Sequence, residues 1–277
     1  MSRAGRALGA DLSVPLPDRS VDDAGDERPP GYLEHSSSPL VSLVFVLPLI
    51  LIYEVGTHGR WGGGHAGGAG NAPPPQHVIA FTLLQQFFGL FGATGRSLPA
   101  LAVVGILLAW HVARQDRWRV RWPTLGGMAI EGSLLSLPLL ALSVLVAQLL
   151  RTLPMAAAGH PALGAGRMPP DDLLILCLGA GIYEELVFRL ILLTVLTLFV
   201  KDLLQFPKGA ATLFVVLLSS VMFSGYHYLG AEAFHWRTFA FRTLAGIYFG
   251  VLFLTRGFGV TAATHAAYDI LVLIILP

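Results

Sequence analysis

The sequence predicts an all-α fold, a polytopic transmembrane bundle of about eight helices. Residues of the apolar set AVILMFWYC make up 54% of the 277 positions and charged residues 13%, about half of the ~25% that is usual in soluble domains. The charges are also unevenly placed, because 11 of the 35 (18 Lys/Arg and 17 Asp/Glu) lie within residues 1–38. Too few remain to cover the surface of a soluble enzyme, so the composition excludes a water-soluble single domain.

Two segments lack the pattern of a membrane helix. Residues 1–38 mix both charge signs with Pro and Gly. Because they hold too little apolar surface to offset the entropy of ordering, we expect a disordered polar N-terminal tail. Residues 57–77 include the run WGGGHAGGAGNAPPPQ, which is typical of a Gly/Pro-rich loop. The net charge of +1 argues against a nucleic-acid partner, since phosphate binding needs a concentrated basic surface.

The remaining sequence divides into runs of membrane-spanning length. A helix needs about 20 mostly apolar residues to cross the hydrocarbon layer. Such runs occur at 39–56, 78–94, 98–113, 126–150, 171–198, 210–228, 237–255 and 258–276. The run 78–94 is the weakest, because Gln85 and Gln86 lie in its middle. We therefore expect N-terminal transmembrane helices within 39–125 and a helical core within 126–277.

The last four runs hold a dense set of ionisable residues. Charge at membrane depth is costly and tends to mark a functional site or an internal pair. Three short motifs follow one another on these runs: EE-x3-R (Glu184, Glu185 and Arg189), F-x3-H (Phe223 and His227) and H-x3-D (His265 and Asp269).

Helical geometry separates the two glutamates. At 100° per residue, Glu185 and Arg189 are about 40° apart around the axis and one turn along, which favours an ion pair. Glu184 lies about 140° from Arg189, so the same arginine does not easily neutralise it. The face of Glu184 also carries small residues that let a neighbouring helix approach closely: Cys177, Ala180 and Gly181. A carboxylate without its own cation on such a face is a candidate general base.

The two histidine motifs supply further candidate groups. His265 and Asp269 repeat the i,i+4 spacing, so the carboxylate can orient the imidazole or turn with it toward a partner. His227 lies near the end of its run, where water can reach it. Together with Glu184, two histidines on separate helices could hold a water molecule, polarise a carbonyl or bind a metal.

In this order on successive apolar segments, the three motifs resemble those of the CPBP family. This family comprises the type II CAAX prenyl endopeptidases and the bacteriocin-processing or Abi-like self-immunity proteases. The similarity covers about residues 130–276. The resemblance implies an all-helical intramembrane fold and hydrolysis of peptide bonds within the membrane. The last motif of the family is H-x3-N or H-x3-D, so Asp269 is an accepted variant.

The resemblance also implies a role for each site residue. Glu184, with His227, would activate the attacking water. His265 and Asp269 would lie near the developing oxyanion, with His265 as the donor, because an ionised aspartate cannot donate. Supporting roles fall to Glu185, Arg189 and Phe223. No HExxH motif is present and the spacing does not require a metal; a divalent ion such as zinc, if bound, would use Glu184, His227 and His265.

The sequence therefore predicts a hydrolase, an intramembrane endopeptidase of the cell membrane that acts on membrane-associated, prenylated or leader peptides. Its expected partners are a peptide or protein substrate and the lipid bilayer. A proton-coupled transporter also places Glu, His and Asp on facing helices, although the sequence shows no internal repeat. A non-catalytic immunity or scaffold protein with the same fold is the other alternative.

Overall fold

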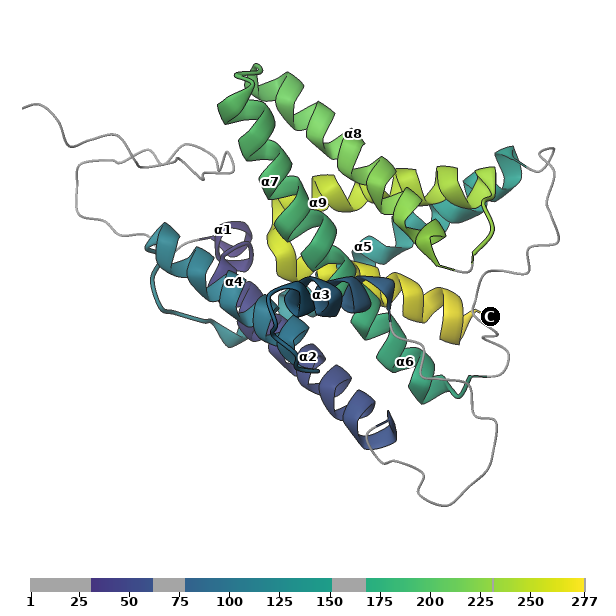
Figure 1. The fold of residues 1–277 in the computed structure, drawn as a ribbon, viewed down its shortest axis with the longest axis horizontal. Coiled ribbons are helices and arrows are strands. Elements are labelled where there is room, and N and C mark those ends of the chain that lie inside the picture. The colour runs from purple at the N-terminus through teal and green to yellow at the C-terminus, as the bar shows by residue number, and fades with distance from the viewer. Residues whose placement is uncertain (1–30, 62–77, 151–167, 231, 277) are drawn as a thin grey trace, which may run out of the picture. The chain divides into compact units, whose positions relative to one another are not determined.

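The structure, a computed structural model, describes residues 31–61, 78–150, 168–230 and 232–276. Within these ranges the ordered elements are all helical and no strand is present, which confirms the predicted all-α class. The elements (Figure 1) are α1 (Tyr32–Ser36), α2 (Pro39–Trp61), α3 (Ile79–Leu90), α4 (Leu98–Arg114), α5 (Trp122–Leu149), α6 (Pro170–Gly179), π-helical Ala180–Glu184 and Leu186–Leu193, α7 (Thr194–Thr197), π-helical Leu198–Leu203, α8 (Lys208–Tyr226), 3₁₀-helical His227–Leu229, α9 (Trp236–Ile270) and π-helical Leu271–Ile275.

The two segments expected to be irregular are only partly described. Residues 1–30 of the expected tail and 62–77 of the expected Gly/Pro-rich loop lie outside the described residues. The described ends of both segments are helical: α1 lies within the expected tail, and α2 continues to Trp61. The physical reason in α1 is tertiary contact, since Arg256 of α9 donates to the backbone oxygen of Leu33 at 3.3 Å.

Helices occur in every run that was predicted to span, but they differ in length. Among the described residues, four helices are long and apolar enough to cross a membrane: Pro39–Thr57, Trp122–Leu149, Lys208–Leu229 and Trp236–Ile275. Helix α3 has only 12 residues, which at 1.5 Å per residue cover about 18 Å of a ~30 Å hydrocarbon layer. The predicted membrane bundle is therefore confirmed, whereas the predicted count of eight spans is approximate.

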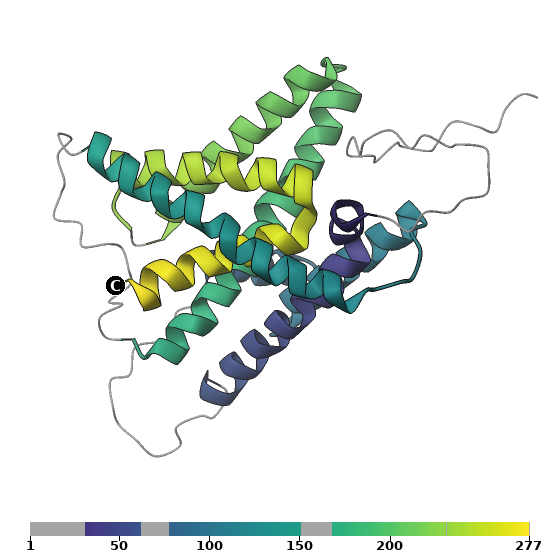
Figure 2. The same cartoon turned by 180° about the vertical axis from the view of Figure 1, so that it is seen from behind.

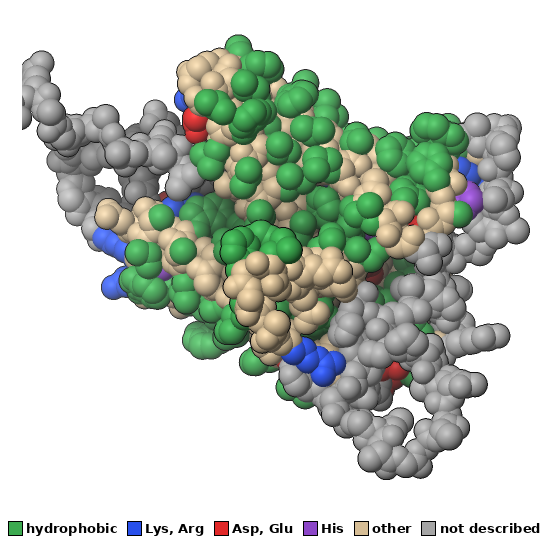
Figure 3. Space-filling view, viewed as in Figure 1, with side chains coloured by type: hydrophobic (Ala, Val, Ile, Leu, Met, Phe, Trp, Pro, Cys, Tyr) green, Lys and Arg blue, Asp and Glu red, His purple; other side chains and the backbone are tan. Residues whose placement is uncertain are grey.

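Helix α9 is the central packing element of the described bundle. Both α5 and α8 pack against it, and α2 contacts α4, α6 and α9 (Figure 1 and Figure 2). The outer surface exposes many large hydrophobic side chains; on the face in Figure 3 they are spread over the described part, and charged side chains appear in only a few places. Since water does not favour such a surface, these helices fit an integral membrane protein.

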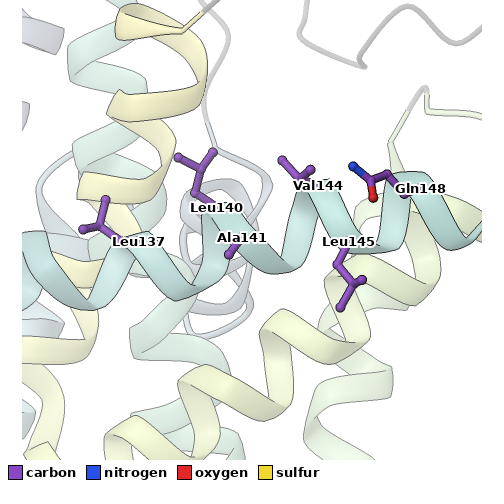
Figure 4. A pocket seen from close by; sticks show the side chains of 6 residues that line it. All are labelled: Leu137, Leu140, Ala141, Val144, Leu145 and Gln148. Carbon is purple, nitrogen blue, oxygen red and sulfur yellow. The ribbon is translucent and has the colours of Figure 1, made fainter.

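Helix α5 shows how little of this outer face is covered. An open apolar groove of about 490 Å³ lies along it (Figure 4). Its lining residues are Leu137, Leu140, Ala141, Val144, Leu145 and Gln148. Leu137, Val144 and Leu145 are each about half exposed, which suits contact with lipid chains. The groove contains none of the ionisable residues singled out above.

Helix α9 consists of two arms that meet at Gly257, and the predicted runs 237–255 and 258–276 correspond to these arms. Gly257 has φ 77° and ψ −179°, a backbone conformation that is essentially restricted to glycine. A Cβ atom at this position would lie 3.0 Å from the backbone oxygen of Ser37. The turn therefore requires glycine both for its dihedral angles and for the close approach of the α1–α2 junction.

Arg256, directly before this turn, fixes it to two other helices. Its guanidinium forms a two-pronged pair with Glu131 of α5, at 2.5 and 2.6 Å, and donates to Ser36 Oγ at 2.9 Å. Tyr32 also donates to Glu131, at 2.7 Å. Burial and the neighbouring carboxylate raise the pKa of Tyr32 to about 12, so its hydroxyl remains a donor at neutral pH. These bonds hold the direction in which the second arm of α9 leaves Gly257.

We expect Gly257→Ala to lower the free energy of unfolding by about 1–3 kcal/mol, because alanine is strained in this backbone conformation. Unfolding of the purified protein in detergent micelles measures the effect. The control is Gly105→Ala in α4, where an added Cβ meets open space and alanine favours the helix. Equal stability of the two variants would contradict the strained turn.

Candidate active site

Glu184 lies in a helical run that departs from α geometry. Helix α6 leads into the π-helical segments Ala180–Glu184 and Leu186–Leu193. π-Helical turns are rare in proteins overall, and those that occur are often found at functional sites. The angles expected from 100° per residue hold for a regular α-helix and do not strictly apply to this segment. Which carboxylate pairs with the arginine must therefore be read from the contacts themselves.

Arg189 pairs with Glu185, as the i,i+4 spacing predicts. Its Nε lies 3.1 Å from Glu185 Oε2, and both residues are at most 1% exposed. Arg189 Nη2 donates to the backbone oxygen of Gly246 at 3.2 Å, whereas the buried Nη1 has no hydrogen-bond partner among the described residues. The ring of Phe223 lies 4.3 Å from the Arg189 Cζ atom, a cation–π distance. Phe223 thus covers the buried cation from the side of α8.

Gly181 lets the second arm of α9 approach this segment closely. A Cβ on Gly181 would lie 2.7 Å from the backbone oxygen of Ala262 and 2.9 Å from the backbone nitrogen of Ala266. The close helix contact expected on this face therefore forms. It brings His265 to Glu185, whose Oε1 lies 2.7 Å from His265 Nδ1. The packing of these two helical segments thus brings residues that are distant in the sequence into one site.

The Glu184 carboxylate faces both imidazoles. Its Oε2 lies 3.8 Å from His227 Nε2 and 3.8 Å from His265 Nε2. Its Oε1 accepts a hydrogen bond from the hydroxyl of Tyr226 at 2.5 Å. Glu184 is 6% exposed, so the group lies within the bundle and away from lipid. Unlike Glu185, it forms no ion pair with Arg189 among the contacts of the described residues.

Each of the two imidazole rings is held in place by a contact on the side away from Glu184. His227 Nδ1 lies 2.8 Å from the backbone oxygen of Phe223. A carbonyl oxygen only accepts, so Nδ1 carries the proton, and a neutral ring then presents an unprotonated Nε2 to Glu184. The ring of His265 is stacked on Phe249, with centroids 4.6 Å apart. Both rings are therefore fixed with Nε2 toward the same carboxylate oxygen.

Asp269 lies on the remaining side of His265. Its Oδ2 is 3.6 Å from His265 Nε2, whereas Glu185, not Asp269, holds Nδ1. The side chains of His227 and Asp269 are 18% and 21% exposed. The site is thus partly exposed at these two residues and buried around Glu185.

The structure brings together all seven residues that the motifs singled out, and it adds contacts that the motifs do not reveal. Tyr226 precedes His227 directly in the sequence, but nothing in the F-x3-H spacing indicates that its hydroxyl reaches Glu184. The bond between Glu185 and His265 joins residues 80 positions apart, so no local spacing could reveal it. The stacking of Phe249 on His265 likewise depends on the tertiary fold and not on a local spacing.

The same geometry shows whether these side chains could hold a metal ion. Among residues 31–61, 78–150, 168–230 and 232–276, no group of three or more His, Cys, Asp or Glu side chains is arranged to hold a metal ion. This includes Glu184, His227 and His265, the conditional zinc ligands of the sequence argument. In the described geometry, Oε2 of Glu184 is engaged with both imidazoles at distances suited to a bridging hydrogen-bonded group.

We expect Arg189→Met to lower the free energy of unfolding by about 3–5 kcal/mol, because it leaves the Glu185 carboxylate buried without its cation. Adding Glu185→Gln removes that charge and retains an acceptor for His265. The double variant should therefore recover part of the lost stability in thermal unfolding of the detergent-solubilised protein. A double variant no more stable than the single one would show that the buried charge is not the cause.

Comparison with known protein families places this site in a recognised context. Residues 168–271 match the family model described as Rce1-like, type II CAAX prenyl endopeptidase. The match confirms the resemblance to the CPBP intramembrane proteases and supports a CAAX-type intramembrane protease, a hydrolase, in general. The matched range contains all three motifs, from Glu184 to Asp269. Comparisons with curated proteins and with solved structures found no match.

Proposed function

We propose that this chain is an intramembrane endopeptidase in which Glu184, with His227, activates a water molecule for attack on a peptide bond. The observation that carries the proposal is the position of one carboxylate oxygen, 3.8 Å from the Nε2 atoms of both His227 and His265. The match of residues 168–271 to the CAAX-type protease family supports the same reaction class.

The distances suit a single bound water. Hydrogen bonds between oxygen or nitrogen atoms span about 2.7–3.0 Å, so one water can bridge Glu184 Oε2 and an imidazole Nε2 that lies 3.8 Å from it. It would donate one proton to Glu184 Oε2 and the other to His227 Nε2, which is free to accept because its Nδ1 donates to Phe223. A water held in this way directs an oxygen lone pair away from both acceptors, toward the exposed side of the site.

Attack by this water follows ordinary general-base chemistry. The water oxygen bonds to the carbonyl carbon of the substrate while Glu184 takes its proton. The carbonyl oxygen becomes an oxyanion, and His265 Nε2 is placed to donate to it. The carboxylate of Glu185 at Nδ1 stabilises the positive charge that His265 carries as such a donor. Glu184 then passes its proton to the leaving nitrogen as the C–N bond breaks.

The surroundings favour a substrate that reaches the site from the bilayer. The apolar outer face of the bundle and the opening at His227 and Asp269 suit a peptide anchored in the membrane, by a prenyl group, by a leader segment or by its own span. We assign the protein to the cell membrane, with lipid and a membrane-associated peptide as its partners.

Cleavage of a panel of peptides by the protein in lipid vesicles tests the proposal. The panel holds a prenylated CaaX peptide, its unprenylated form and a leader peptide, and products are read by mass spectrometry. Removing a general base costs typically 10²–10⁴-fold, so we expect kcat for the cleaved peptide to fall by that range in Glu184→Gln and in His227→Ala. The control is Asp202→Asn, at an exposed position remote in sequence from the motifs. Full activity in both site variants would overturn the mechanism.

The other two classes give different results in the same vesicles. Solute uptake driven by a pH gradient, without cleavage of any peptide, would identify a proton-coupled transporter. A scaffold would show neither activity in the vesicles. In cells, Glu184→Gln would then leave the phenotype unchanged, whereas loss of the second arm of α9 would abolish it.

A further inference from the structure

Tyr226 contacts the candidate base from the neighbouring helix. It is the last residue of α8 and is 6% exposed. Its hydroxyl donates a hydrogen bond to Glu184 Oε1 at 2.5 Å. None of the three motifs includes this residue. A buried phenol needs an acceptor, but that requirement does not explain why the acceptor is the one carboxylate that faces both histidines.

The bond decides which oxygen of Glu184 meets the water. The terminal torsion of a glutamate side chain has a broad, roughly two-fold distribution, so an unrestrained carboxylate can exchange or tilt its oxygens. With Oε1 held by Tyr226, Oε2 is the oxygen that remains for His227 and His265. The carboxylate plane is then fixed before a substrate arrives.

The ring of Tyr226 is held independently of its hydroxyl. It packs on Phe188 and on His227, with ring centroids 4.8 and 4.4 Å apart, and Phe223 lies 6.1 Å away. These contacts are between rings and do not involve the hydroxyl, so a phenylalanine at this position keeps them. The structure therefore separates the contribution of the hydroxyl from that of the packing.

We propose that Tyr226 is a positioning residue of the active site, whose hydroxyl holds Glu184 Oε1 so that Oε2 alone receives the proton of the attacking water. This inference rests on the proposed function, because it assigns a role within that reaction. It adds a third partner of Glu184 to His227 and His265, and it makes the residue directly before the motif histidine part of the active site. Because its hydroxyl is bonded to Glu184, we expect Tyr226 to act on the chemical step and not on substrate binding.

Tyr226→Phe tests the role of the hydroxyl. Because misplacing a catalytic group by about 1 Å can cost 10²-fold, we expect kcat to fall about 10- to 100-fold while KM stays within about twofold. The infrared carboxylate band of Glu184, assigned by difference from Glu184→Gln, should shift with the loss of its donor. The matched control is Tyr248→Phe, which also loses one hydroxyl bond, a partly buried one to the backbone of Leu135, and should keep kcat.

The possible results separate this inference from the proposed function. If Glu184→Gln is inactive and Tyr226→Phe keeps both its kcat and its carboxylate band, the role of Tyr226 is overturned and the reaction stands. If Glu184→Gln is fully active, the reaction itself falls. Should Tyr226→Phe fail to fold, 3,5-difluorotyrosine at position 226 keeps the ring and hydroxyl and changes only the strength of the donor. An unchanged kcat and band in that protein would equally overturn the inference.

Discussion

Glu185 holds two partners at once, and the arrangement of the site depends on this. One carboxylate oxygen lies 3.1 Å from Arg189 on its own helix, and the other lies 2.7 Å from the His265 ring on α9. The first contact engages the only arginine of the three motifs, so Glu184 forms no ion pair with it. The second fixes the far side of the His265 ring, so its other nitrogen faces Glu184. A neutral residue at position 185 could supply a hydrogen bond but could not balance the buried arginine.

The membrane makes such double use of a carboxylate necessary. Lipid offers no hydrogen bonds, so each ionisable group within the bundle needs partners inside the protein. The second cluster, at the break of α9, obeys the same rule, since Arg256 donates to Glu131 and to acceptor oxygens of α1. One cluster fixes the turn at Gly257, and the other fixes the helix that follows it. Together they place the His265 arm against Gly181 with little freedom.

The sequence predicts those features that depend on short spacing. The composition determines the all-α membrane class, the i,i+4 spacing of Glu185 and Arg189 predicts their pair, and Gly181 predicts a close helix contact. Features that depend on tertiary approach were not predictable. The π-helical geometry around Glu184 is set by packing, and the contact of Tyr226 joins residues 42 positions apart. Hydropathy also did not determine the number of spans, because a short apolar helix such as α3 fits the hydropathy pattern but is too short to cross the membrane.

The central claim is that Glu184 is free of Arg189 and holds a water between the two imidazoles. A density map of the protein in lipid, at a resolution that shows bound water, tests this most directly. The account predicts one ordered water within hydrogen-bond distance of Glu184 Oε2 and of Nε2 on both His227 and His265. A Glu184 side chain turned toward Arg189 or toward lipid, with no water between the rings, would contradict it.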